Sequence, residues 1–146
     1  MALLELRDEH ALAQTSDDLA GLWLSRSGDL QRDLEDPAVF ANTVGRLADA
    51  ARAIGAEAIK GVSHTGQTLA EAVAGELRLQ TWRGDRVASL LLVDGLVNTG
   101  IQIALAVRAA QAVGVHDVRA LAIRADARAL DRLNRTGAQV AALEVI

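Results

Sequence analysis

Apolar residues recur at helical spacing early in the chain. Between Pro37 and Gly55 they fall four or three positions apart, which places them on one face of a helix. These residues are Phe40, Val44, Leu47, Ala51 and Ile54. Asp36 can cap the start of this helix, Pro37 suits its first turn, and Gly55 favours its end. The stretch up to about Leu24 also reads as helix, and Ser27–Asp29 separates the two.

From residue 58 onward, short apolar runs alternate with helical patterns. Runs of strand length lie at 58–62, 77–82, 87–93, 118–123 and 139–146. Helical patterns follow Gly66 and occupy 101–113 and 126–134. The run 87–93 is apolar nearly throughout, which is typical of a strand buried on both faces. This alternation predicts an α/β fold, with a mostly parallel sheet of about five strands flanked by helices.

Length and composition narrow the class of protein. The 146 residues suit a single domain over 1–146, with a helical part over 1–56 and an alternating β/α core over 57–146. No apolar run is long enough to cross a bilayer and no signal peptide is recognisable, so we expect a cytoplasmic protein without membrane contact. The net charge of −4 and the absence of a basic stripe argue against nucleic-acid binding.

Two residue types bear on metal chemistry. The chain has no cysteine, which excludes disulfides and thiolate metal sites. Its three histidines are too scattered along the sequence to suggest a metal site. We therefore expect no metal held by the protein alone.

One candidate site is the polar segment Asp94–Gly100, which is expected to be a loop between a buried strand and a helix. Free N–H groups at a helix start, together with the helix dipole, favour a bound anion. Asn98 and Thr99 add side-chain donors, and Asp94 at the strand tip can accept hydrogen bonds from sugar hydroxyls or hold a divalent cation. The alternative is an ordinary turn, in which Asp-Gly supplies turn chemistry and Asn or Thr caps the helix.

A second candidate is the segment Gly61–Thr68, which also joins a strand to a helix through an expected polar loop, Ser63–Gly66. It resembles a P-loop in which Gln67 stands where the phosphate-binding lysine belongs, and this argues against an ATPase. A turn that cradles an anion without the lysine remains open. His64 could contact phosphate or assist proton transfer, or it could simply be an exposed loop histidine.

Together and in this order, the two segments resemble the type I phosphoribosyltransferases. The run from Leu90 to Gly100 looks like the family's signature, in which an apolar strand and two acidic residues lead into a Thr-Gly phosphate loop. The run from Gly61 to Ala70 is similar to the family's pyrophosphate loop. Arg26–Gly28 resembles the opening of orotate phosphoribosyltransferases, and the closing segment resembles that subgroup's last helix and strand. The resemblance covers most of the chain.

The resemblance implies a central parallel sheet with a small hood and a reaction on phosphoribosyl pyrophosphate, with Mg²⁺ as a possible cofactor. It implies that Asp94 binds a ribose hydroxyl as the catalytic-site carboxylate. The residues implied to surround the 5′-phosphate are Asn98, Thr99, Gly100, Ile101 and Gln102. The residues implied to line the pyrophosphate site are Ser63, His64, Thr65 and Gly66.

The sequence departs from the family pattern in two ways. Gly95 stands in place of the second acidic residue, which removes a ribose partner worth about 1.5–3 kcal/mol. Restoring it with Gly95→Asp is expected to tighten ribose-phosphate binding. The family's long mobile lid is also missing, because only residues 82–86 are available for it, although Arg83 and Arg86 could lend charge.

Three functions follow from this sequence. The favoured one is a phosphoribosyltransferase-fold protein that binds a phosphoribosyl compound or a nucleoside 5′-monophosphate and has lost catalysis. The first alternative is an active orotate- or purine-type phosphoribosyltransferase. The second is a regulatory or structural partner protein without catalysis. An Ala/Leu/Val-rich surface and the prevalence of symmetric pairs predict a homodimer.

Overall fold

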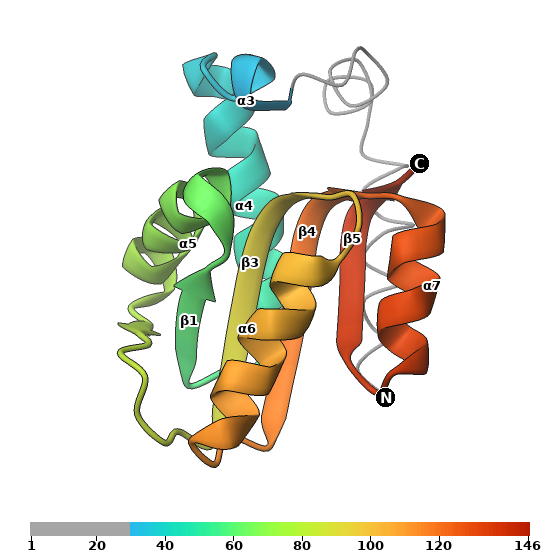
Figure 1. The fold of residues 1–146 in the computed structure, drawn as a ribbon. Helices are drawn as coiled ribbons and strands as arrows, with labels where there is room; N and C mark the ends of the chain where they lie inside the picture. Colours follow the sequence, from blue (N-terminus) through green and yellow to red (C-terminus); the bar gives the residue numbers. More distant parts are fainter. Residues whose placement is uncertain (1–29) are drawn as a thin grey trace.

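The computed structural model describes residues 30–146, which form alternating helices and strands (Figure 1). The predicted helix up to about Leu24 and the Arg26–Gly28 motif lie outside these residues. The single-domain assignment over 1–146 therefore stays a prediction. The elements are α3 (Leu30–Asp33), α4 (Pro37–Ile54), β1 (Ala58–Gly61), α5 (Ser63–Leu77), β2 (Gln80–Thr81), β3 (Ser89–Val97), α6 (Ile101–Ala112), β4 (Asp117–Ala125), α7 (Ala127–Arg135) and β5 (Gln139–Val145).

The five strands form one parallel sheet in the order β2-β1-β3-β4-β5, as the sequence pattern predicts. Each face of this sheet is covered by helices. Leu91 and Val93 of β3 pack in a core with α4 and α5, whereas Leu90 and Leu92 pack in a second core with α6 and α7. This burial on both faces explains why β3 is apolar nearly throughout.

The helix from Pro37 begins and ends where the sequence predicts. The Asp36 carboxylate accepts a hydrogen bond from the Ala38 amide at 2.9 Å, and Gly55 ends the helix in a left-handed conformation with φ of 71°. Of the predicted apolar face, Val44, Leu47 and Ala51 are buried, and Phe40 and Ile54 are partly buried against the same core. Among the helices described for residues 30–146, none is long and apolar enough to cross a membrane.

Two predicted loops are partly regular structure instead. β3 continues to Val97, because its pairing with β4 continues through Asp94, Leu96 and Val97, so only residues 98–100 form a loop. The expected loop Ser63–Gly66 is the first turn of α5. The sheet pairing of β3 and the packing of α5 outweigh the local preference of these residues for turns.

The strand predicted at 77–82 is only two residues long. Helix α5 runs to Leu77 and ends at Arg78 in a left-handed conformation, which leaves Gln80–Thr81 as β2. β2 pairs with the first residues of β1, so the connection from β2 to β3 lies at the amino-terminal edge of the sheet (Figure 1). This connection is tied down, since the Trp82 indole donates to the Asp85 carbonyl at 2.7 Å.

Candidate functional site

The strand order changes direction between β1 and β3. From β1 the chain continues through α5 to β2 on one side, and from β3 it continues through α6 to β4 on the other. The helices that leave these two strands therefore cover opposite faces of the sheet, and a crevice opens at the carboxyl ends of β1 and β3. In open α/β sheets, ligands bind in such a crevice. Both candidate segments of the sequence meet here.

Asp94 lies inside β3 and is nearly buried, with 4% of its surface exposed. Its Oδ1 accepts hydrogen bonds from the Ser63 hydroxyl at 2.8 Å and from the Gly95 amide at 2.8 Å. Burial raises the pKa of this carboxyl above its ordinary value, and the hydrogen bonds from Ser63 and Gly95 offset part of that rise. Within residues 30–146, Oδ2 makes no hydrogen bond, so one oxygen of the carboxyl group remains free to accept.

Ser63 connects the two segments. Its hydroxyl donates to Asp94 and accepts a hydrogen bond from the Gly66 amide at 3.3 Å, in the manner of a helix cap. The residue has a φ of 69°, a left-handed conformation that costs a non-glycine residue about 1–3 kcal/mol. The two hydrogen bonds help to hold it there. Backbone strain of this kind concentrates at functional sites.

Two glycines let the turn after β1 approach its neighbours closely. A Cβ added to Gly61 would overlap the backbone of Gln67, and one added to Gly66 would overlap the Val93 carbonyl oxygen. The same Cβ on Gly66 would lie 3.0 Å from the Asp94 Cα. The spacing of Gly61 and Gly66 therefore seats the first turn of α5 directly against β3, beside Asp94.

The loop from Asn98 to Gly100 leads into α6 and forms the second half of the site. Gly100 caps the helix with φ of 85°, and the first helical hydrogen bond runs from the Ala104 amide to the Gly100 carbonyl. The amides of residues 101–103 therefore have no partner within the helix, and the Ile101 amide donates to the Thr99 hydroxyl at 3.4 Å. These residues, the loop and Asp94 line an open hollow of about 420 Å³, which leaves room for an anion.

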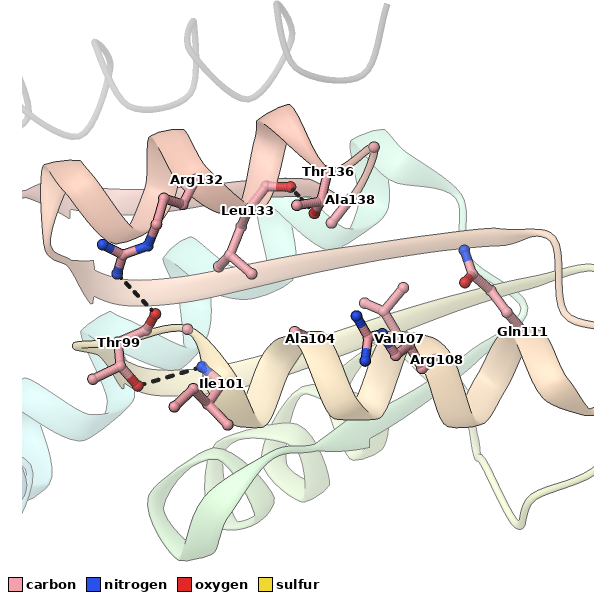
Figure 2. A pocket seen from close by; sticks show the side chains of 12 residues that line it. Thr99, Ile101, Ala104, Val107, Arg108, Gln111, Arg132, Leu133, Thr136 and Ala138 are labelled. Carbon is pink, nitrogen blue, oxygen red and sulfur yellow. Dashed lines mark hydrogen bonds between the residues drawn. The ribbon is translucent and has the colours of Figure 1, made fainter.

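Helix α7 supports this loop from the far side, as Figure 2 shows. The Arg132 guanidinium donates to the Thr99 carbonyl at 3.1 Å. Leu133 packs under Gly100, where an added Cβ would lie 2.9 Å from its Cδ1. Neither residue is predicted to support the loop from the sequence, since both lie more than thirty positions from it and no local motif marks them.

The structure brings most of the predicted site residues together, although not always as predicted. Ser63, His64, Thr65 and Gly66 lie on the first turn of α5, with His64 exposed. Thr65 points at Gly95: a Cβ on Gly95 would lie 2.8 Å from the Thr65 Cγ2. Thr65 thus occupies the space that a side chain at position 95 would need.

The expectation that Arg83 and Arg86 could lend positive charge to the ligand site is wrong. Both belong to the connection at the amino-terminal edge of the sheet, opposite the crevice (Figure 1). The Arg86 side chain lies beside Gly114 in the turn before β4, where a Cβ added to Gly114 would lie 3.4 Å from the Arg86 Cδ. Neither arginine can therefore reach a ligand beside Asp94.

The described residues do not form a cation site by themselves. Among residues 30–146, no group of three histidine or acidic side chains lies close enough to hold a metal ion. Within that range Asp94 is the single carboxylate that lines the hollow, and its Oδ1 already accepts hydrogen bonds. Mg²⁺ commonly binds through one or two carboxylates plus substrate phosphates, so here it would enter with a phosphorylated ligand.

No protein-family model matches the chain, and no curated protein matches it. Solved structures do match in fold. The Aeropyrum pernix orotate phosphoribosyltransferase is 21% identical with a TM-score of 0.68, over 80% of this chain and 76% of that one. The Leishmania tarentolae adenine phosphoribosyltransferase is 13% identical with a TM-score of 0.69, over 80% and 75%. Leishmania donovani UMP synthase is 21% identical with a TM-score of 0.66, over 80% of this chain but 29% of the larger protein.

Proposed function

We propose that this chain, which has the fold of the type I phosphoribosyltransferases, binds phosphoribosyl pyrophosphate or a nucleoside 5′-monophosphate without turning it over efficiently. The observation that carries this proposal is the hollow at the carboxyl end of β3. Among residues 30–146 it is lined by one carboxylate, Asp94, and by the first amides of α6, which have no partner within the helix. A sugar phosphate carries both complementary groups, hydroxyls and an anion.

The phosphate is proposed to lie against the amides of residues 101–103, where the helix dipole favours negative charge. The hydroxyl of Thr99 and the side chain of Asn98 adjoin this position and supply further donors. The ribose then extends toward Asp94, whose Oδ2 accepts a hydrogen bond from a ring hydroxyl. Asp94 acts as a binding group in this proposal.

A second phosphate group has a place at the start of α5. This helix also begins with free amides, and its first-turn residues Ser63 and His64 are exposed toward solvent. The hydroxyl of Ser63 bridges this turn to Asp94, so a pyrophosphate here would adjoin the ribose. In this proposal the start of α6 binds the 5′-phosphate of phosphoribosyl pyrophosphate, and the start of α5 binds its pyrophosphate.

Catalysis is proposed to be lost because nothing in the described chain closes over the crevice. Phosphoribosyl transfer builds positive charge on the ribose while pyrophosphate leaves, and that separation needs preorganised charge in a site closed to water. The connection after β2, which would have to supply a lid, is short and pinned at the opposite edge by the Trp82–Asp85 hydrogen bond. We expect turnover with orotate, adenine, guanine and hypoxanthine to be absent or very weak.

A specific observation supports association as well as binding. Leu96, Ile101 and Leu105 are 41%, 62% and 58% exposed, and they lie around the start of α6. Arg108 is the one charged residue between 101 and 112, whereas a surface helix normally carries a charged outer face. We propose that this apolar surface packs against a second copy of the chain, which makes a homodimeric binding protein the form to test.

Calorimetry with phosphoribosyl pyrophosphate, UMP and AMP, with and without Mg²⁺, tests the binding. We expect saturable binding that weakens about 10- to 100-fold in Thr99→Val, because a hydrogen bond to a charged group is worth about 1.5–3 kcal/mol. Thr81→Val, at an exposed threonine on the edge strand β2, is the matched control and should bind normally. No binding by the folded protein would contradict the proposal, and so would equal weakening in both variants.

A steady-state assay tests the catalytic part separately. Turnover in the ordinary enzyme range of about 1–1000 per second would show that the protein is an active transferase. The lid function would then have to come from a partner copy or from residues before Leu30.

A further inference from the structure

A second hollow lies on the other side of the loop Asn98–Gly100, which we call the phosphate loop. It is a groove between α6 and α7 with a volume of about 430 Å³, within the range of small-molecule pockets (Figure 2). Its floor is made of small and apolar side chains, namely Ala104, Val107, Leu133 and Ala138. Its rim is polar. Thr99, Gly100 and Ile101 line this groove and also the hollow beside Asp94, so one three-residue segment separates the two.

The charge of this groove is one-sided. Of the residues from Leu30 onward, two arginines line it, Arg108 from α6 and Arg132 from α7, and no carboxylate does. Within residues 30–146, Arg108 makes no hydrogen bond or ion pair, and Arg132 donates only to the Thr99 carbonyl. The carboxylate of Asp131 on α7 is already paired with Arg135 at 2.9 Å. Two guanidinium groups therefore line the groove with no carboxylate from the described part of the chain beside them.

We propose that the groove between α6 and α7 is a second binding site, which takes an organic phosphate. Guanidinium groups recognise phosphate through paired hydrogen bonds. Arg108 and Arg132 bind the phosphate in this site, and Gln111 and Thr136 add polar contacts at the rim. The apolar floor lies against the organic body of the ligand, such as a base or sugar ring, because small-molecule pockets are lined mostly by apolar side chains.

Occupation of this groove acts on the phosphate loop through Arg132. A phosphate in the groove competes with the Thr99 carbonyl for the Arg132 guanidinium, since a guanidinium bonds an oppositely charged phosphate more strongly than a neutral carbonyl. Withdrawal of Arg132 removes a support of the loop beside Asp94. The groove ligand should therefore weaken binding in the crevice, and by thermodynamic linkage the crevice ligand should weaken binding in the groove equally. This coupling rests on the proposed function, whereas binding in the groove does not.

Backbone amide shifts of ¹⁵N-labelled protein, titrated with AMP and separately with inorganic phosphate, test both parts. One set of signals, Arg108, Gln111 and Gly137, reports on the groove, and a second, Gly66 and Asn98, reports on the crevice. With AMP we expect the groove set to move along its own saturable curve, with an affinity that falls at least about tenfold in Arg108→Gln. Inorganic phosphate should move the same signals less tightly. Arg108→Gln should leave the intrinsic affinity of the crevice unchanged, because Arg108 does not contact the phosphate loop.

The outcomes separate the two proposals. A groove set that stays still at millimolar AMP, or that moves equally in Arg108→Gln, overturns the second site. A groove set that moves while the crevice set stays still supports the groove and contradicts the proposed function. For the coupling, Arg132→Gln should weaken the crevice several-fold, and Arg132→Lys, which can still donate to the Thr99 carbonyl, should restore part of the loss. Equal crevice affinity in Arg132→Gln and the unmodified protein overturns the coupling.

Discussion

Gly95 gives the sharpest test of the geometry around Asp94. The resemblance to phosphoribosyltransferases suggests that Gly95→Asp should restore a ribose partner. The structure predicts the opposite, because a Cβ at this position would lie 2.8 Å from the Thr65 Cγ2, 3.2 Å from the Thr65 Cβ and 3.4 Å from the Leu30 Cδ2. Any side chain at position 95 must therefore push the first turn of α5 away from β3.

The size of the effect follows from that overlap. Ordinary contacts of a Cβ begin at 3.4 Å, so the Thr65 methyl group must move by about 0.6 Å. Overpacking of this kind costs about 1–3 kcal/mol of unfolding free energy, or a fall in Tm of roughly 3–12 °C for a chain of this length. Thr65 belongs to the same turn of α5 as Ser63, whose hydroxyl donates to Asp94. A displaced turn disturbs that hydrogen bond, so sugar-phosphate binding should also weaken in Gly95→Asp.

Chemical denaturation of Gly95→Ala, Thr65→Ala and the double variant measures the contact. Thr65→Ala removes the methyl group at 2.8 Å, so the double variant should be more stable than the two single changes predict by about 1 kcal/mol or more. Gly45→Ala in α4 is the control, since a Cβ there meets nothing within 4 Å. A Gly95→Ala protein as stable as the unmodified one, or strict additivity in the double variant, would refute the reasoning.

Three further predictions follow. Gly66→Ala should lower the free energy of unfolding by about 1–3 kcal/mol or more, because its Cβ overlaps the Val93 carbonyl. Gly75→Ala in the same helix, where a Cβ meets nothing within 4 Å, should raise it by up to about 1 kcal/mol. Equal stability of the two variants in urea unfolding would contradict the close approach of Gly66 to β3. Because the pKa of Asp94 is raised in the folded state, its contribution to stability is present below the unfolded pKa and is lost as pH rises through the folded pKa. The stability of Asp94→Asn relative to the unmodified protein should therefore rise over that pH range. Parallel pH profiles of stability for the two proteins would contradict this. Light scattering should show a dimer that dissociates in Ile101→Glu, and a monomer at all micromolar concentrations would end the homodimer prediction.

The pattern of apolar residues was sufficient to predict the parallel sheet and the helix that begins at Pro37. Those features depend on local signals: a capping aspartate before proline, period-four burial and an apolar run in β3. The boundaries failed where tertiary packing decides the conformation. Asp94 and Gly95 look like a turn in sequence, but the pairing of Asp94 and Leu96 with β4 keeps this segment extended.

The residue types of the site could also be predicted, but not their contacts. The segments after β1 and β3 could be assigned to one edge of the sheet from topology alone. The hydrogen bond between Ser63 and Asp94 joins residues 31 positions apart, and its discovery required the register of two strands. The supporting role of Arg132 depends on how α7 packs beside α6, which no motif in the sequence encodes.

A crystal structure with ribose 5-phosphate tests the central claim most directly, because this ligand carries the phosphate and the ribose but no base. We predict that its phosphate lies against the amides of Ile101 and Gln102 and that a ribose hydroxyl donates to the carboxylate of Asp94. A sugar phosphate bound elsewhere on the molecule would contradict the account. A neighbouring side chain that occupies the space at the Asn98–Gly100 loop and leaves no room for a phosphate would also contradict it.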